Sequence, residues 1–119
     1  MTFALRRGAA AEDRALRHLQ RQGLKLLARN WRCARGELDL VMDDAGTLVL
    51  VEVRSRARAD YGGALESVQA RKRQRLVRAA QAYLAAHPQY ARRSARFDVV
   101  VFEGDAPPQW IKAAFDAED

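Results

Sequence analysis

The chain has 119 residues, a length that favours a single domain over residues 1–119 with about two thirds of its unfolded surface buried on folding. Hydrophobic residues make up 49% and charged residues 30%, which is typical of a globular protein and argues against a disordered one. No apolar run reaches the ~20 residues needed to cross a bilayer, and no secretory signal is visible, so we expect a cytoplasmic protein without a membrane partner. One cysteine, Cys33, and two histidines exclude an internal disulfide and a zinc-type cluster.

The net charge of +6 comes with 21 basic residues, of which 18 are arginine because lysine occurs only at positions 25, 72 and 112. Guanidinium groups match phosphate geometry, which favours DNA as a partner. Composition alone is weak support, since a bias toward arginine also follows from genome base composition. Position is more telling, because the basic residues crowd two segments: Arg54, Arg56 and Arg58 after one predicted strand, and Arg71, Lys72, Arg73, Arg75 and Arg78 along one predicted helix.

The first predicted element is a helix from about Leu5 to Gln22 that ends at Gly23. Its inward stripe has the spacing of an amphipathic helix and consists of Leu5, Gly8, Ala9, Glu12, Ala15, Leu16 and Leu19. Glu12 is the charged member of that stripe. Either it meets a cation or a metal ion there, or it lies at the margin of the stripe and reaches solvent, and the periodicity leaves both open.

Three strands are predicted next, over residues 24–33, 36–43 and 48–54, with a tight turn at 34–36. The second and third strands carry acidic residues inside runs of Val and Leu. Because side chains alternate along a strand, Glu37 and Asp39 share one face of the second strand, and Glu52 and Arg54 share one face of the third.

The register of this hairpin decides what those residues do. A loop at 44–47 pairs Asp43 with Leu48, which sets Asp39 opposite Glu52 and Glu37 opposite Arg54. Facing carboxylates at that spacing can hold one metal ion. A slip of one residue would send Asp39 to the other face. The alternative is that the face carrying these residues has a purely structural role, as a solvated surface on which Glu37 and Arg54 form an ion pair.

The second half of the chain begins with an Arg-rich loop that ends at Tyr61-Gly62-Gly63. A second helix is predicted from about Ala64 to His87, closed by Pro88. Lys72 and Gln69 fall within its apolar stripe; such a lysine either reaches solvent over the edge of the core or acts in a site. A strand at 96–102 and an edge strand at 109–115 follow. The predicted fold class is α/β (α+β), in the order α-β-β-β-α-β(-β), with a mixed central sheet flanked by helices.

Five segments in this order resemble the YraN-like family: Gly36-Glu-Leu-Asp-Leu, Val51-Glu-Val-Arg-Ser-Arg, Tyr61-Gly62, Lys72-Arg-Gln-Arg-Leu and Arg96-Phe-Asp-Val-Val. That family is similar to archaeal Holliday-junction resolvases and to the restriction-endonuclease-like PD-(D/E)xK nucleases. The resemblance implies a Mg²⁺ or Mn²⁺ site of Asp39 and Glu52, with Glu12 as a further carboxylate. It also implies that Arg54 stands at a position where most of the superfamily has lysine.

This departure bears on catalysis, because arginine is always charged and makes a poor general base. Lys72 is the candidate for the missing amine. The expected catalytic set is thus Asp39, Glu52, Arg54, Glu12 and Lys72, with Glu37 and Gln69 as secondary candidates and Arg56, Arg58, Arg71, Arg73 and Arg75 as nucleic-acid-binding residues.

Three functions follow as hypotheses. The first is a metal-dependent endonuclease that acts on branched or single-stranded DNA; by resemblance some nucleases of this fold act as dimers, so a homodimer is one arrangement open to the chain. The second is a nucleic-acid-binding protein of the same fold without catalysis. The third is a protein-interaction adaptor whose charge serves solubility alone.

Overall fold

The computed structural model describes residues 3–56 and 70–116. Its elements run in the order α1 (Phe3–Arg21), β1 (Lys25–Cys33), β2 (Gly36–Asp44), β3 (Thr47–Arg56), α2 (Ala70–Ala86), a short 3₁₀ helix (Pro88–Tyr90), β4 (Ala95–Glu103) and β5 (Gln109–Phe115). The predicted order and class are confirmed. None of the helices in these two ranges is long and apolar enough to cross a membrane. Residues 64–69, where the second helix was predicted to begin, lie outside the described residues.

One five-stranded sheet holds the molecule together, in the order β1-β2-β3-β4-β5. All neighbours are antiparallel except β3 and β4, which run parallel from Leu48–Ala95 to Arg56–Glu103. The parallel pair requires a crossover between the two strands, and α2 lies in that connection. The sheet is therefore mixed, as predicted.

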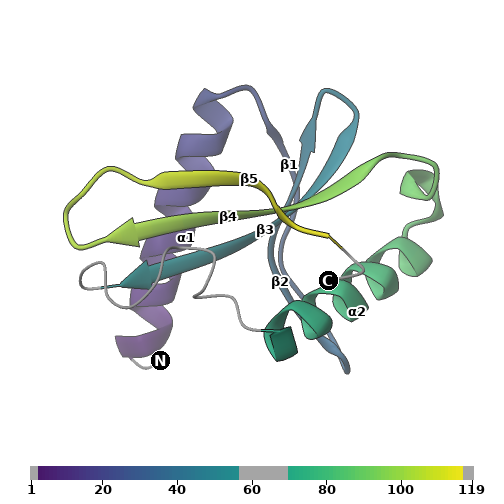
Figure 1. Ribbon diagram of the computed structural model, residues 1–119, viewed down its shortest axis with the longest axis horizontal. Coiled ribbons are helices and arrows are strands. Elements are labelled where there is room, and N and C mark those ends of the chain that lie inside the picture. Colours follow the sequence, from purple (N-terminus) through teal and green to yellow (C-terminus); the bar gives the residue numbers. More distant parts are fainter. Residues whose placement is uncertain (1–2, 57–69, 117–119) are drawn as a thin grey trace.

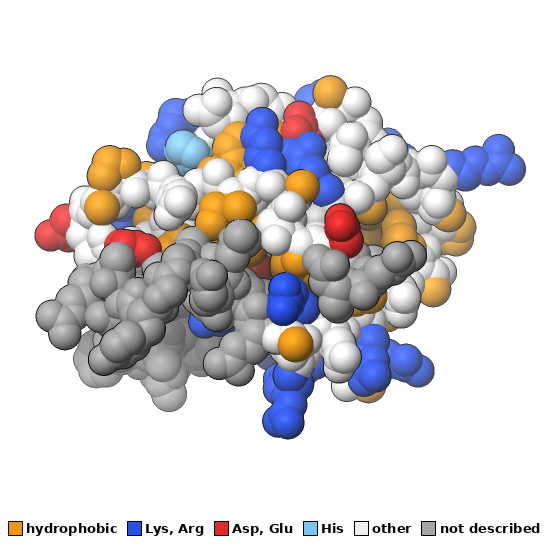
Figure 2. Space-filling model, in the orientation of Figure 1, with side chains coloured by type: hydrophobic (Ala, Val, Ile, Leu, Met, Phe, Trp, Pro, Cys, Tyr) orange, Lys and Arg blue, Asp and Glu red, His pale blue; other side chains and the backbone are white. Residues whose placement is uncertain are grey.

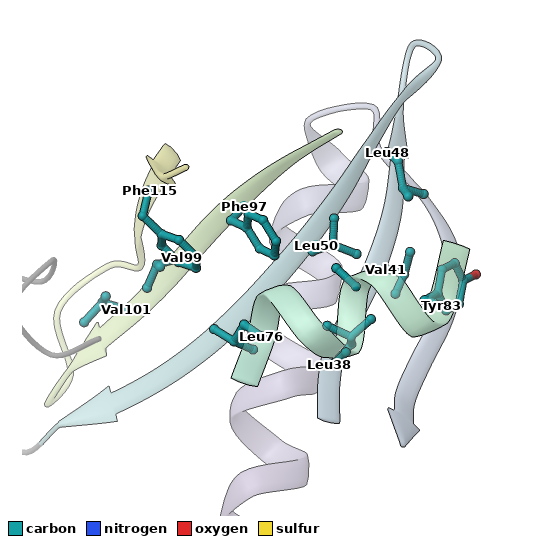
Figure 3. Packing of buried hydrophobic residues seen from close by; sticks show 12 residues of the cluster. Leu38, Val41, Leu48, Leu50, Leu76, Tyr83, Phe97, Val99, Val101 and Phe115 are labelled. Atoms are coloured by element: carbon teal, nitrogen blue, oxygen red, sulfur yellow. The ribbon is translucent and has the colours of Figure 1, made fainter. Parts of the chain in front are cut away.

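The two helices cover opposite faces of the sheet, with α1 behind it and α2 in front in the view of Figure 1. Ala15 and Leu19 of α1 are fully buried against the back face. The α1 stripe was predicted correctly there, although Ala9 is exposed. On the front, the apolar side of α2 packs on the sheet. Figure 3 labels Leu76 and Tyr83 of the helix and, from the strands, Leu38, Val41, Leu48, Leu50, Phe97, Val99, Val101 and Phe115.

The hairpin between β2 and β3 has the predicted register, since Asp43 pairs with Leu48 and Leu40 with Val51. Beyond Leu40–Val51 the two strands part: β2 continues with β1 down to the Cys33–Gly36 pair, while β3 continues with β4. Figure 1 shows the two halves of the sheet diverging at this point. We call the divergence the fork. It opens the sheet from within, at the place where the acidic motif residues lie.

Asp98 is a buried carboxylate that joins β4 to β5. It is fully buried, and its two oxygens accept hydrogen bonds from Arg96 Nε (3.0 Å), Trp110 Nε1 (2.9 Å) and the main-chain N of Ala113 (2.9 Å). Ala113 has a φ of 50°, and the ladder register shifts beside it, between Phe97 and Val99 of β4. The carboxylate thus supplies the partner that an irregular strand leaves its amide without.

Replacing Asp98 by asparagine tests this role. The Asp98→Asn side chain keeps its shape and one acceptor oxygen for Arg96 and the Ala113 amide, but it loses the negative charge beside Arg96 and turns an NH₂ group toward the N–H of Trp110. We expect a loss of about 2–4 kcal/mol in the free energy of unfolding, measured by urea denaturation. Asp105→Asn, in the exposed turn between β4 and β5, is the control and should change stability by less than about 0.5 kcal/mol. Equal stability of the two variants would contradict the assignment.

Candidate functional site

Asp39 lies at the fork and holds its two halves together. Its Oδ2 accepts a hydrogen bond from the main-chain N of Val53 at 2.9 Å. The pairing of β2 with β3 ends at Leu40–Val51, and from there the Asp39 carboxylate is the group of β2 that accepts the hydrogen bond of this β3 amide. The side chain is thereby fixed in direction, with its other oxygen free of this bond. The predicted residue is thus oriented by the very strand that carries Glu52.

Glu52 stands next to Asp39 and is 6% exposed. Burial raises the pKa of the Glu52 carboxyl to about 8, with a hydrogen bond to Asp39 and the negative charge of Asp39 adding to the rise. Two adjacent carboxylates repel when both are ionised. Burial and the neighbouring charge of Asp39 therefore favour the protonated form of Glu52.

Two basic side chains approach this pair. Lys72 Nζ of α2 lies 3.5 Å from Glu52 Oε2, and the lysine side chain is 42% exposed. Arg54 follows on β3, half-buried, and its positive charge acts on Glu52, as does that of Lys72, to lower the pKa of that carboxyl. The ammonium of Lys72 therefore reaches Glu52 from α2, whereas Arg54 lies on the same strand as Glu52.

The carboxylates line a hollow of about 460 Å³ between the arms of the fork and α2. Its lining residues are Arg32, Cys33, Gly36, Glu37, Asp39, Glu52, Lys72, Arg75 and Leu76. Gly36 allows the close approach of the β1–β2 turn to the helix, since a Cβ there would lie 3.0 Å from the main-chain O of Arg75. On the face drawn in Figure 2, Lys and Arg side chains project from the lower edge, where Figure 1 places α2.

Glu12 reaches the neighbourhood of Asp39 from α1. Its side chain is 14% exposed and pairs with Arg29 Nε of β1 at 3.3 Å. Arg29 also binds Asp13 (2.6 Å) and the main-chain O of Ala9 (3.1 Å), so it ties β1 to α1. Burial raises the pKa of Glu12, and the charge of Asp39 raises it further, while hydrogen bonds from Arg29 and Asn30 oppose the rise. Of the two alternatives for Glu12, a cationic partner is the one observed.

Glu37 has a different partner from the predicted one. The hairpin pairing ends before it, and its carboxylate lies 3.5 Å from Arg32 Nε, its register partner on β1. The expected opposition to Arg54 is wrong, because β2 follows β1 away from β3. Arg71 and Arg75 are exposed on α2, while Arg73 is half-buried. The side chain of Arg56, and all of Arg58 and Gln69, lie outside the described residues.

Sequence reasoning missed several members of the site. Arg29 and Arg32 lie on the first predicted strand, and no local pattern in that strand indicates that they meet acids on other segments. Gly36 was visible only as a turn residue. The main-chain N of Val53 carries no side-chain signal at all. These groups come together through the fork, which the alternation of apolar residues does not encode.

The donor set suits a hard divalent cation. Asp39 and Glu52 offer carboxylate oxygens, which Mg²⁺ prefers, and the hollow has room for the waters that this ion keeps. In residues 3–56 and 70–116, no three His, Cys, Asp or Glu side chains gather closely enough to hold a metal ion by themselves. An ion here would thus depend on two carboxylates and solvent.

The fold and site define a mixed α+β protein whose forked sheet has a hollow lined by carboxylates and basic side chains. Residues 11–102 match the family described as "Uncharacterised protein family UPF0102", and the chain belongs to this family. It is 56% identical over 113 residues to a UPF0102 protein of Pseudomonas entomophila, with 92% of each chain covered. It is 55% identical to one of Pseudomonas putida, covering 93% of this chain and 94% of the relative, and 53% identical to one of Pseudomonas aeruginosa, covering 93% of each.

The raised pKa of Glu52 predicts how stability depends on pH. Between the ordinary carboxyl pKa of 4.5 and about 8, the folded state keeps a proton that the unfolded state has released. The free energy of unfolding contributed by this group therefore falls as pH rises across that window. Glu52→Gln removes this titrating group. From pH 5 to pH 9, the free energy of unfolding of the variant should therefore rise by about 2–4 kcal/mol relative to that of the native protein. Urea denaturation in EDTA at both pH values measures this difference.

Asp105→Asn serves as the control, because it removes an exposed carboxylate and should leave the native pH dependence unchanged. A Glu52→Gln variant whose stability falls with pH as steeply as that of the native protein would show that Glu52 is ionised throughout.

Proposed function

We propose that this protein is a metal-dependent endonuclease of the PD-(D/E)xK type that hydrolyses phosphodiester bonds in branched or single-stranded DNA. The observation that carries the proposal is the fixed pair of Asp39 and Glu52 in an open hollow, with the Lys72 ammonium 3.5 Å from Glu52. Metal-assisted phosphodiester hydrolysis uses oriented carboxylates that hold a divalent ion, and a nearby ammonium group such as that of Lys72 can carry a proton. The +6 net charge supports a polyanionic substrate.

Asp39 and Glu52 would hold Mg²⁺ or Mn²⁺, with Glu12 as a further acid close to Asp39. When bound, such an ion polarises a phosphoryl oxygen and makes a water more acidic. The chain itself contributes orientation and charge. The Val53 amide fixes the direction of Asp39, and Lys72 brings a proton-carrying group to the edge of the hollow. Arg54 offers a permanent positive charge for the phosphate.

Conservative substitutions test the metal-binding pair. Asp39→Asn keeps an oxygen for the Val53 amide but loses the negative charge. Glu52→Gln likewise keeps the size of its side chain and loses the charge. Both variants should fold, lose Mn²⁺ binding by calorimetry and lose detectable cleavage of a panel of single-stranded, flap, four-way-junction and duplex DNAs. Asp105→Asn should retain native activity. Cleavage that survives in either variant, or a native protein that cuts no member of the panel with Mg²⁺ or Mn²⁺, would refute the proposal.

The roles of Lys72 and Arg54 can be distinguished by testing whether a lysine at position 54 restores the cleavage rate that is lost when Lys72 is replaced. Lys72→Met should lower the cleavage rate by about 100-fold or more, because it removes a proton-carrying group from the site. Arg54→Lys restores a lysine at the signature position, so the double variant Lys72→Met/Arg54→Lys should recover much of the lost rate. Single-turnover assays with saturating DNA measure both effects. A Lys72→Met variant with native activity would remove Lys72 from the mechanism.

Arg54 also favours a second candidate function, nucleic-acid binding without cleavage. A guanidinium at the signature position binds phosphate but does not exchange a proton at neutral pH. This candidate predicts DNA affinity that falls steeply with salt and does not require Asp39, with no product from any substrate. The cleavage panel described above separates the two functions.

A further inference from the structure

The β1–β2 hairpin forms one wall of the hollow that holds Asp39 and Glu52, and it brings an arginine to that hollow. Arg32 of β1 is directly opposite Glu37 of β2, and its side chain is 69% exposed at the rim. Neither residue belongs to the two basic segments that the sequence marks for DNA binding. The hollow is therefore flanked by positive charge on a side that those segments do not supply.

The opposite wall is α2, which contributes Arg75 to the same hollow. The two walls are in contact at one end, where Gly36 lies against the main-chain O of Arg75 and a Cβ would approach that oxygen to 3.0 Å. This contact fixes the spacing between hairpin and helix. Two exposed guanidinium groups thus flank Asp39 and Glu52 from two separate elements.

The ion pair of Arg32 is suited to exchange. Its Nε lies 3.5 Å from Glu37 Oε2, and both side chains are solvent-accessible, at 69% and 38%. Exposed pairs of this kind contribute little to stability. A phosphate diester offers the guanidinium a charged acceptor of matching geometry, and charge-assisted bidentate bonds are stronger than a single long contact. Arg32 can therefore change partner without cost to the fold.

We infer that Arg32 is a phosphate-binding residue which Glu37 holds at the rim until a nucleic-acid backbone displaces the carboxylate. The β1–β2 hairpin and α2 then contact the backbone on both sides of the acidic pair. The inference rests on the proposed function in one respect, that the ligand of the hollow is nucleic acid. It adds a contact surface and a competing internal acid to that function.

Binding without metal tests the inference apart from cleavage. The probe is a fluorescein-labelled single-stranded oligonucleotide, followed by fluorescence anisotropy in EDTA over a range of salt concentrations. Arg32→Gln should weaken binding on the order of 3- to 10-fold at low salt and reduce the slope of log affinity against log salt by about 0.7. Arg17→Gln, exposed on α1 across the sheet, removes the same charge and should have a smaller effect on both.

A double-mutant cycle isolates the role of Glu37. Glu37→Gln should strengthen binding more than Asp105→Asn does, although both remove one negative charge. In the Arg32→Gln background that advantage should shrink toward the Asp105→Asn value, because there is no longer a guanidinium to release. Circular dichroism of each variant confirms that the fold is retained.

Equal effects of Arg32→Gln and Arg17→Gln overturn the inference, and so does a Glu37→Gln gain that is independent of Arg32. Either result leaves the nuclease proposal standing if metal-dependent cleavage still requires Asp39. A native protein that binds no DNA at low salt removes both. A native protein that binds with the predicted cycle but never cuts supports the inference and refutes cleavage alone.

Discussion

The hydrogen bond from the Val53 amide to Asp39 Oδ2 is the interaction on which the site depends. A sheet that splits between two of its central strands leaves peptide groups without ladder partners, and an unpaired buried amide is costly. A carboxylate on one strand satisfies the amide of the other. The same atom that closes the sheet electrostatically also fixes the acidic pair, so the defect in the sheet and the site share one cause.

The fork places Glu52 where a charge is poorly solvated. Burial raises the pKa of Glu52 to about 8, so the folded protein disfavours the ionised form of this side chain. Apolar packing on both faces of the sheet supports this arrangement, with Leu40 and Met42 fully buried behind and Val41 and Leu48 fully buried in front. A poorly solvated ionisable group of this kind is tolerated because the packing around it is stable, and such groups are common at functional sites.

The sequence predicted the fold well because the signals were local. The turn at Asp44-Ala45-Gly46-Thr47 set the hairpin register as far as Leu40 and Val51, and the apolar stripes predicted α1 and the described part of α2. Extrapolating that register to Glu37 failed, since the strands separate beyond the range in which the turn controls pairing. The partners of Glu12 and Asp98 come from other strands, Arg29 of β1 and Trp110 of β5. No periodicity in one segment can indicate such contacts.

Sheet topology gives Ala113 a significance beyond its hydrogen bond. It lies on β5, the terminal strand of the sheet, whose outer row of peptide groups is a potential template for another chain. A left-handed residue (φ 50°) and a shifted register interrupt that row, and a buried acid on the neighbouring strand maintains the irregularity. With exposed Lys112 beside it on the same strand, this irregularity leaves β5 a poor template for pairing with another chain.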